Sequence, residues 1–380
     1  FSRNFSDGIL YKMYYFDHSA TTPVQPAVLD LMNSFQSNVY GNPSSVHSQG
    51  RKARSIIENA RKQVAKSIQA NPNQIIFTSG GTEANNQVLW SMAHNDKKHV
   101  ISNVIEHPAV IKVLQSLEPL GLEHTLVPVN KNGSVLVKDV ENSIQDGTGL
   151  ISVMLGNNEM GTIQPVKEIV EMASAKGILV HTDAVQCLGK MKVDVSELGV
   201  DFLSLSAHKF YGPKGIGILF IKEKETLSSF MIGGNQESGL RAGTENVASI
   251  AGIGLAAELI TTELNQHIDQ LNQFESQFKS GLKVFFPNAV FNGNPSNTLP
   301  GLVSVSFPGH RSDILLAKLD QANMAVSSGS ACGAGDVKPS TVLSAMGIDD
   351  DINISTLRFS FGSSNTIGQV DSLLAELKSI

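Results

Sequence analysis

A lysine lies directly after a short apolar run in the middle of the chain. Lys209 follows the run at residues 202–205 and precedes a segment of aromatic residues and glycines at 210–215. Taking a lysine out of water lowers the pKa of its ammonium group, and the free amine is a nucleophile. This setting differs from that of a surface lysine, so Lys209 is predicted to be a Schiff-base lysine.

Two other segments place polar groups after apolar runs. Residues 79–83 form a Gly-rich turn after the run at 75–77, and a turn of this kind at a helix start suits a phosphate, with Thr82 adding a hydroxyl. The alternative is that Thr82 only caps the helix. Asp183 follows the run at 178–180, where a partly buried carboxylate needs a cationic or hydrogen-bonding partner. The alternative for Asp183 is an N-cap of a following helix.

A histidine and two asparagines occupy equivalent positions. His107 follows the run at 100–101, and Asn157 and Asn158 follow the run at 150–155. A lone histidine in such a turn is usually structural, and paired asparagines are common turn formers. For His107 and for the two asparagines, the structural role and a role in contacting a ligand both stay open.

The elements that must position these groups alternate between two hydrophobic periods. Buried strands are expected at 75–77, 100–101, 122–127, 150–155, 178–180, 202–205 and 216–221, and amphipathic helices at 56–68, 84–93, 109–117 and 166–175. Alternating strands and helices predict an α/β fold with a mostly parallel sheet, and near-continuous apolar runs indicate strands buried on both faces. Ligands of such sheets bind beyond the carboxyl ends of the strands.

The combination of groups is more informative than any one of them. A phosphate cradle, an aspartate and a lysine are expected on successive strand ends of one sheet. Pyridoxal phosphate (PLP) requires this set: a phosphate site, a carboxylate at the pyridinium nitrogen and a lysine amine. The sequence therefore predicts a PLP site.

The second part of the chain has a different pattern. One long helix or two are expected over 248–282, followed by strands at 302–307 and 356–361 and helices at 314–323, 341–346 and 370–377. This pattern predicts a large α/β domain at 16–257 and a smaller α+β domain at 258–380, which also takes in residues 1–15. Residues 1–12 begin with Phe, contain no signal-peptide core and are left out of the fold argument.

Composition narrows the classes of function. The 380 residues include 41% hydrophobic and 17% charged side chains, with a formal net charge of −6, so no broad basic face for direct nucleic-acid binding is expected. No apolar run approaches the roughly 18–20 residues that span a bilayer. The two cysteines, Cys187 and Cys332, are expected to be free thiols in a reducing compartment, the cytoplasm. No metal site is predicted.

Ten stretches of the chain resemble those of the cysteine desulfurases, in the class V branch of fold-type I PLP-dependent enzymes. These stretches are DHSATTP at 17–23, YGNPSS at 40–45, FTSGGTE at 77–83, EH at 106–107, NNE at 157–159, DAVQ at 183–186, SAHK at 206–209, RAGT at 241–244, SSGSAC at 327–332 and STLRFS at 355–360. They occur in family order over nearly the whole chain. The resemblance implies a fold-type I transferase with a large, mostly parallel seven-stranded sheet.

The resemblance also implies a role for each matching position around the cofactor. Lys209 would carry PLP, Asp183 would hold the pyridinium nitrogen, and His107 would stack on the ring and assist proton transfers. Gln186 would donate a hydrogen bond to the phenolic oxygen. The implied phosphate-binding positions are Gly81, Thr82, Ser206 and His208, together with Thr244 reaching the site of a neighbouring subunit, so that the family implies a homodimer.

Substrate and sulfur-transfer positions are implied in the same way. Asn158 and Arg358 would hold the carboxylate of L-cysteine, because the planar fork of Arg matches a carboxylate. Asn158 is also an implied cofactor-binding position. Cys332 lies in a Gly-rich loop expected to be mobile, and it would take sulfur as a persulfide while alanine is released. The loop has the length of the branch that supplies general sulfur trafficking. Cys187 is expected to be structural, at the apolar start of a helix.

The expected acceptor of the sulfur is a cluster-scaffold protein or a tRNA-thiolation enzyme. Other reactions on the same scaffold remain alternatives: a selenocysteine lyase, a class V aminotransferase or a kynurenine-type hydrolase. A different alternative is an inactive sulfur-carrier or interaction subunit. The chain departs from the family pattern at His18, Leu155, Asn235 and Ser238, none of which is a predicted catalytic position.

Overall fold

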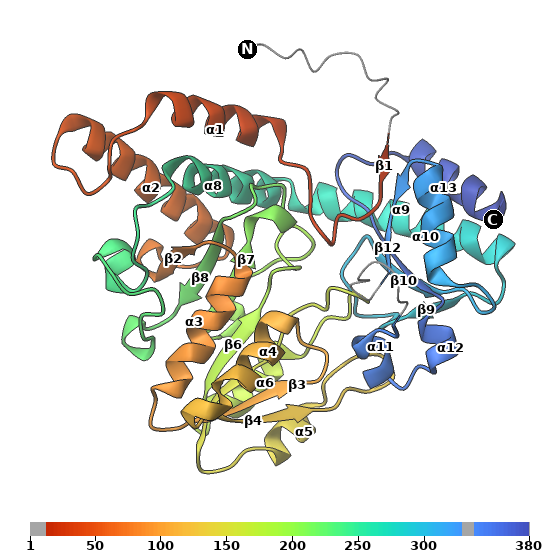
Figure 1. The fold of residues 1–380 in the computed structure, drawn as a ribbon, viewed down its shortest axis with the longest axis horizontal. Helices are drawn as coiled ribbons and strands as arrows, with labels where there is room; N and C mark the ends of the chain where they lie inside the picture. The colour runs from red at the N-terminus through yellow and green to blue at the C-terminus, as the bar shows by residue number, and fades with distance from the viewer. Residues whose placement is uncertain (1–12, 329–337, 380) are drawn as a thin grey trace.

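The computed structural model describes residues 13–328 and 338–379, and Cys332 lies outside these ranges (Figure 1). Its largest sheet has seven strands, of which only β8 runs antiparallel to its neighbours. In spatial order they are β2 (Ile75–Thr78), β8 (Gly217–Ile221), β7 (Phe202–Ser206), β6 (Leu179–Asp183), β5 (Thr148–Ser152), β3 (His99–Asn103) and β4 (Glu123–Val127). The predicted α/β class with a mostly parallel seven-stranded sheet is confirmed.

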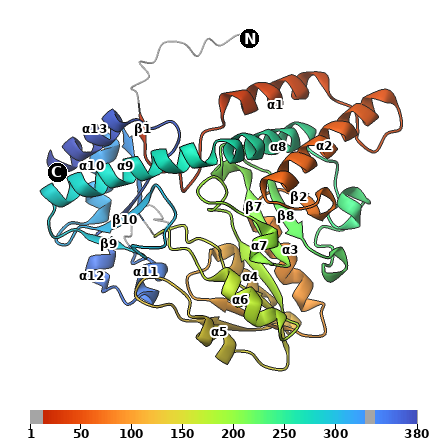
Figure 2. The same cartoon turned by 180° about the vertical axis from the view of Figure 1, so that it is seen from behind.

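Helices cover both faces of this sheet (Figures 1 and 2). On one face lie α3 (Gly81–Ala93) and α4 (Pro108–Leu117), and on the other lie α2 (Ser48–Ser67), α6 (Val166–Ser174) and α8 (Val247–Thr262). Successive strand residues point to opposite faces, so both must be apolar in a buried strand. This explains why the strands read as continuous apolar runs.

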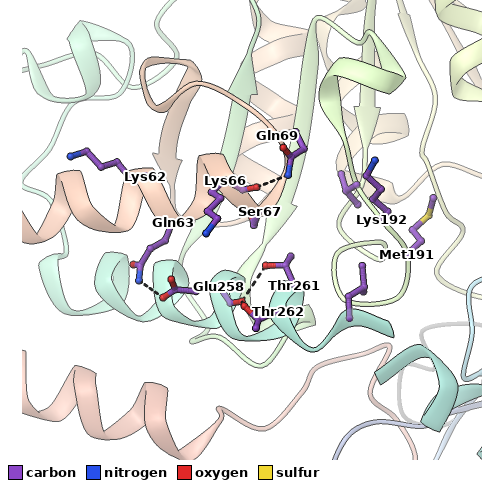
Figure 3. Close-up of a pocket in the computed structure, with 12 residues that line it drawn as sticks. Lys62, Gln63, Lys66, Ser67, Gln69, Met191, Lys192, Glu258, Thr261 and Thr262 are labelled. Atoms are coloured by element: carbon purple, nitrogen blue, oxygen red, sulfur yellow. Dashed lines mark hydrogen bonds between the residues drawn. The ribbon is translucent and has the colours of Figure 1, made fainter. Parts of the chain in front are cut away.

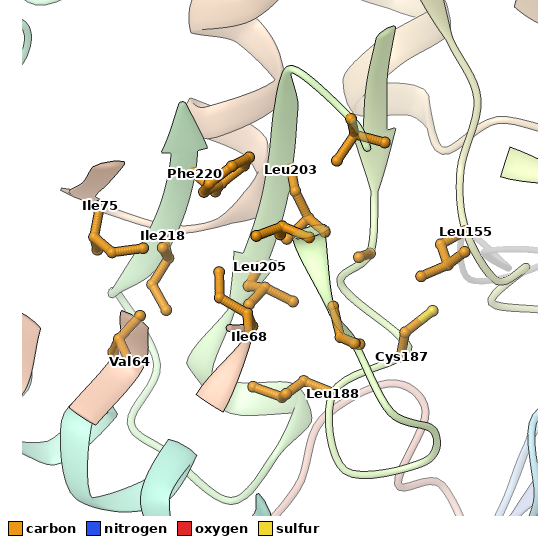
Figure 4. Close-up of a cluster of buried hydrophobic side chains, with 14 of the residues drawn as sticks. Val64, Ile68, Ile75, Leu155, Cys187, Leu188, Leu203, Leu205, Ile218 and Phe220 are labelled. Atoms are coloured by element: carbon orange, nitrogen blue, oxygen red, sulfur yellow. The ribbon is translucent and has the colours of Figure 1, made fainter. Parts of the chain in front are cut away.

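One of the two apolar layers is shown in Figure 4. Leu203 and Leu205 of β7 and Ile218 of β8 belong to the same buried cluster as Val64 and Ile68 of the α2 segment. Each is at most 1% exposed. Burying a side chain of this size stabilises the fold by about 1.5–3 kcal/mol. The carboxyl edge of the sheet is therefore fixed by packing on both sides.

A second, antiparallel sheet has its own core. It contains β12 (Ser327–Ser328), β13 (Thr356–Ser360), β10 (Leu302–Ser306) and β9 (Val290–Asn292), and it packs against α9 (Leu264–Phe285), α10 (Ser312–Gln321) and α13 (Ile367–Ser379). The amino-terminal strand β1 (Tyr14–Tyr15) pairs with β11 (Met324–Ala325), and Phe16 is buried in this core.

The chain passes between the two cores at a bend between helices. The axes of α8 and α9 meet at 73°, so the segment expected as one long helix or two is two. Over the described ranges no single helix is long and apolar enough to cross a membrane. Within these ranges, only α8 and α9 taken together have the length and composition of a membrane-crossing segment, and they are bent where they meet. The division into domains at residues 257 and 258 stays a prediction.

Several local elements differ from expectation. The helix expected from residue 56 begins at Ser48, because Nδ1 of His47 accepts a hydrogen bond from the Gly50 N–H (3.2 Å) and caps it. No helix starts after Asp183, so the N-cap alternative and the helix expected at Cys187 are both wrong. The α-helices not expected from the sequence are α1 (Pro26–Asn38), α5 (Val137–Asn142), α7 (Val195–Leu198) and α12 (Asp350–Asn353), and the short strands β1, β9, β11 and β12 were not expected either. The expected short helix near 341–346 is α11 (Thr341–Ala345).

A buried ion pair holds the loop after β8 against α2 and β2. Both guanidinium Nη atoms of Arg61 donate to Glu237, at 2.8 and 2.7 Å, and Nη1 also donates to the Ile75 carbonyl (2.7 Å). Glu237 accepts a further hydrogen bond from the Phe77 N–H (2.9 Å) and has a left-handed backbone with φ of 48°. Its backbone strain is therefore offset by four hydrogen bonds within this small group.

We expect Glu237→Ala to lower the free energy of unfolding by about 3–5 kcal/mol, because it leaves the Arg61 cation buried without its partner. Denaturant titration followed by circular dichroism measures this change. The matched control is Asp313→Ala, which removes an exposed ion pair with Arg311 and should leave the unfolding transition unchanged. Equal transitions for the two variants would contradict the prediction.

Candidate active site

A cavity of about 320 Å³ opens at the carboxyl edge of the large sheet. It brings together most of the residues that the sequence singled out, from five strand ends and from the second sheet. Those that line it are Gly81, Thr82, His107, Asn158, Asp183, Gln186, Ser206, His208, Lys209 and Arg358. The groups predicted at successive strand ends therefore do share one pocket.

Lys209 ends a short 3-10 turn, η3 (Ala207–Lys209), directly after β7. Its Nζ donates hydrogen bonds to the carbonyl oxygens of Ser19 (2.5 Å) and Ala20 (2.9 Å). Burial and the nearby Arg358 charge lower the pKa of Lys209 from 10.5 to about 8, against the opposing effect of Asp183 and Asp17. A substantial fraction of the amine is thus uncharged in mildly alkaline solution and is able to act as a nucleophile or base.

Asp183 is the last residue of β6, the strand beside β7. One carboxylate oxygen accepts a hydrogen bond from Nδ2 of Asn85 (2.6 Å) and the other from the Val185 N–H (3.0 Å). The side chain is 8% exposed and faces the cavity. Sequence reasoning missed Asn85, although it lies one helical turn after Thr82 on α3, where a side chain returns to the same face.

His107 caps α4 at the cavity wall. Its Nδ1 accepts a hydrogen bond from the Ala109 N–H (3.1 Å), so a ring proton lies on Nε2. Burial lowers the pKa of His107, with Lys209 adding to the effect and Asp183 opposing it. The histidine has the predicted structural role as a cap, and its neutral ring also faces the cavity.

The Gly-rich turn lies at the amino end of α3. Gly80 is the N-cap residue, and the Ala84 N–H donates to its carbonyl oxygen (3.2 Å). The N–H groups of the preceding positions, including Gly81 and Thr82, have no acceptor within the helix. Ser206 and His208 line the same end of the cavity. This end offers the backbone donors and the helix dipole that suit a phosphate.

Arg358 reaches the cavity from β13 of the second sheet. Its Nη2 forms an ion pair with Asp17 (2.9 Å) and its Nη1 donates to the Asn158 carbonyl oxygen (2.9 Å), while Nε has no partner among the described residues. Asp17 lies in one of the matching stretches but had no predicted role. Asn157 is the turn former, since its Oδ1 accepts from the N–H groups of Glu159 (2.8 Å) and Met160 (3.1 Å).

Two predicted residues lie elsewhere, and a third is not described. Thr244 is exposed and lines a different cavity together with Tyr40 and Pro43. Cys332 lies outside the described residues. Cys187 is fully buried, as expected for a structural cysteine, and burial raises the pKa of its thiol. Between residues 13 and 379, leaving out 329–337, no group of three His, Cys, Asp or Glu side chains is placed to hold a metal ion.

The residues of the cavity fit PLP. Phosphate donors lie at the end of α3, and Asp183 supplies a carboxylate of the kind that binds a pyridinium nitrogen. Lys209 supplies the amine. The first N–H groups of α3 have no acceptor within the helix, and the phosphate of an anionic cofactor would supply one.

The fold and the cavity define a class of enzyme, and comparison with known proteins agrees. Residues 14–373 match the family model of aminotransferase class-V. The chain belongs to this family, whose members use PLP.

Relatives narrow the class further. The chain is 41% identical over 374 residues to a cysteine desulfurase IscS of Clostridium botulinum, with 97% of this chain and 94% of the relative covered. It is 43% identical over 360 residues to a putative cysteine desulfurase IscS of Bacillus subtilis, covering 94% and 95%. A solved NifS-like protein superposes with a TM-score of 0.91 at 37% identity, covering 97% and 98%. The chain is therefore a member of the cysteine desulfurase family.

The lowered pKa of Lys209 gives a direct prediction. In cofactor-free protein, trapping of a small aldehyde on Lys209 by cyanoborohydride should be half-maximal near pH 8, because the reactive form is the free amine. The pKa of an ordinary lysine is about 10.4, so its trapping would be half-maximal only at that higher pH. Arg358→Gln should move the midpoint to higher pH, since it removes a nearby positive charge. Peptide mass spectrometry measures the modified fraction, and a wild-type midpoint above 10 would contradict the prediction.

Proposed function

We propose that the chain binds PLP in this cavity and removes sulfur from L-cysteine, leaving alanine and a persulfide on Cys332. The observation that carries the proposal is the convergence of the Lys209 amine and the Asp183 carboxylate on one cavity at neighbouring strand ends. The relatives named as cysteine desulfurases support the reaction. A solved structure titled "SspA in complex with cysteine" supports the substrate; it is 34% identical with a TM-score of 0.81, covering 93% of this chain and all of the other.

Each side chain would have a defined task in this reaction. Bound PLP supplies an electron sink for the charge that develops when cysteine loses its α-proton. Lys209, with its lowered pKa, would carry the cofactor and then accept that proton. Asp183 would keep the ring nitrogen protonated, with Asn85 fixing its carboxylate. The neutral His107 ring would lie against the cofactor.

The substrate carboxylate would bind at the side of the cavity that faces the second sheet. Arg358 is held between Asp17 and the Asn158 carbonyl oxygen, which fixes the plane of its guanidinium group. The remaining Nε–H is buried and has no acceptor among the described residues. A carboxylate is the chemical group that would satisfy it, with the Asn158 amide as a second donor.

Sulfur transfer would use the second cysteine of the chain. The thiolate of Cys332 would attack the substrate sulfur, so that an S–S bond forms and the substrate C–S bond breaks. The electron pair of the C–S bond would stay with the substrate carbon, which takes up a proton, and the carbon skeleton would leave as alanine. The other cysteine is unsuited to this task. Cys187 is 0% exposed and burial raises the pKa of its thiol, which disfavours the thiolate.

We expect Cys332→Ser to retain the PLP absorbance band but to reduce multiple-turnover sulfide release from cysteine to the background rate, because serine cannot accept the sulfur. Alanine and sulfide assays measure the loss. Cys187→Ala is the matched control and should keep activity. Full activity in Cys332→Ser would remove the proposed role of this residue.

A homodimer with shared sites is part of the proposal. Thr244 lines a cavity of about 410 Å³ that shares no lining residue with the active-site cavity and is bordered by the 40–43 turn. Two large apolar side chains are exposed beside this turn, Tyr40 at 81% and Val46 at 87%. Neighbouring exposed apolar groups are found on surfaces that another chain covers.

Mixed dimers test the sharing of sites. Thr244→Val should weaken PLP binding by about 10–100-fold through loss of a hydrogen bond to a charged group. A dimer of one Lys209→Ala chain and one Thr244→Val chain then contains one intact site, because Lys209 of one chain meets Thr244 of the other. Tagged co-purification and cofactor titration should give one tight site per two chains. The absence of any tight site would show that each chain uses its own Thr244.

Some predictions from the sequence reach beyond these observations. The cluster-scaffold or tRNA-thiolation acceptor and the cytoplasmic location stay predictions. The alternative of an inactive carrier has no support in the cavity, because Lys209 and Asp183 are both in place.

A further inference from the structure

A second lysine is buried behind the cavity wall. Lys190 lies in the loop after β6 and is 7% exposed. Its Nζ donates a hydrogen bond to Oε1 of Gln186 (3.0 Å) and reaches Oγ of Ser19 (3.5 Å). Within residues 13–328 and 338–379 it forms no ion pair with a carboxylate. An ammonium group in such a place is costly for the fold, so stability does not explain it.

Lys190 sets the orientation of the Gln186 side chain. An ammonium group only donates hydrogen bonds, so the amide must turn its oxygen toward Lys190 and its nitrogen away. Nε2 of Gln186 accordingly donates to the Ser19 carbonyl oxygen (2.9 Å), the same atom that accepts from Lys209 (2.5 Å). The second N–H of the amide is left for a group in the cavity, which Gln186 lines.

Lys190 is also coupled by charge to Lys209. The pKa of Lys190 is lowered from 10.5 to about 7, mainly by burial and then by the positive charges of Lys209 and Arg358. Cys187 opposes the shift. The pKa of Lys209 is about 8, so Lys190 loses its proton first and Lys209 still carries most of its own at that point.

The other titratable groups behind the cavity are neutral. Burial, with Lys190 as the next contribution, lowers the pKa of His18 to about 3 and that of His267 to about 4. Both ring nitrogens of His18 lack a partner among the described residues, and His267 lies 3.4 Å from the hydroxyl of Tyr211. Lys190 is therefore the group on this side whose charge changes near neutral pH.

We propose that Lys190 is a positioning residue of the active site, which turns the Gln186 amide toward the phenolic oxygen of the cofactor. The inference rests on the proposed function. A donor to the phenolic oxygen makes the cofactor-linked nitrogen of Lys209 less basic. Removal of Lys190 therefore has a defined sign.

The main experiment compares two variants of Lys190 in the PLP-loaded protein. Lys190→Met removes the donor and the charge, and should raise the pKa of the cofactor-linked nitrogen by about one unit, a tenfold change in proton affinity. Lys190→Gln keeps a donor to Gln186 without the charge and should give a smaller shift. The pH titration of the cofactor absorbance band measures both.

Lys192 supplies a matched control two residues away. It lines a separate surface groove, whose other side is formed by residues of α2 and α8 such as Lys66 and Glu258 (Figure 3), and it pairs with Glu197 (2.6 Å). Lys192→Met should leave the cofactor titration unchanged. Equal titrations for wild type and Lys190→Met, or equal shifts for the Lys190 and Lys192 variants, would overturn the proposal.

A second measurement separates this inference from the proposed function. In cofactor-free protein with ¹⁵N-labelled glutamine, the side-chain amide resonance of Gln186 should shift in Lys190→Met but not in Lys192→Met, because only the first variant removes the donor to its oxygen. If the wild-type protein binds no PLP, the proposed function fails while this resonance still tests the orientation of Gln186. An unchanged Gln186 resonance in Lys190→Met would overturn the proposal whatever the cofactor does.

Discussion

The parallel pairing of β6 with β7 is the constraint on which the site depends. Asp183 pairs in register with Ser204, and neighbouring strands lie about 4.8 Å apart. A carboxylate at one strand end and the turn that carries Lys209 at the next must therefore emerge side by side. The antiparallel strand β8 adds the third component, because Gly217 lies so close to Gly80 that a Cβ at 217 would be 2.6 Å from its backbone. A larger residue there would displace the amino end of α3 and its N–H groups.

The segment at residues 17–22 joins this edge to the second sheet. Asp17 forms a bridge with Ser360 and an ion pair with Arg358, while the carbonyl oxygens of Ser19 and Ala20 accept from Lys209. The same segment thus contacts the amine that is proposed to carry the cofactor and the cation that is proposed to hold the substrate. Backbone carbonyls stabilise a lysine without adding a negative charge, so its pKa stays low despite two hydrogen bonds.

The sequence predicted the parts of the site that depend on local pattern. Lys209, Asp183 and the Gly-rich turn each follow an apolar run, and the rule for parallel sheets then places them at one edge. It did not predict contacts made across long separations. Asn85 meets Asp183 from 98 positions away, and Lys190 is recognisable only once Gln186 is seen beside it. The N-cap reading of Asp183 failed because its carboxylate accepts from Val185 in a turn that no helix follows.

The placement of positive groups in the cavity argues for an anionic ligand. Arg358 lies on the side of the second sheet, and the amino end of α3 lies on the other side. Of the carboxyl groups nearby, Glu106 has its pKa raised to about 8 by burial, and burial likewise raises the pKa of Glu159 to about 7. A phosphate at the amino end of α3 and an amino-acid carboxylate beside Arg358 would each lie next to positive charge. Asp183 would then be free to bind the one group of the cofactor that carries positive charge, its ring nitrogen.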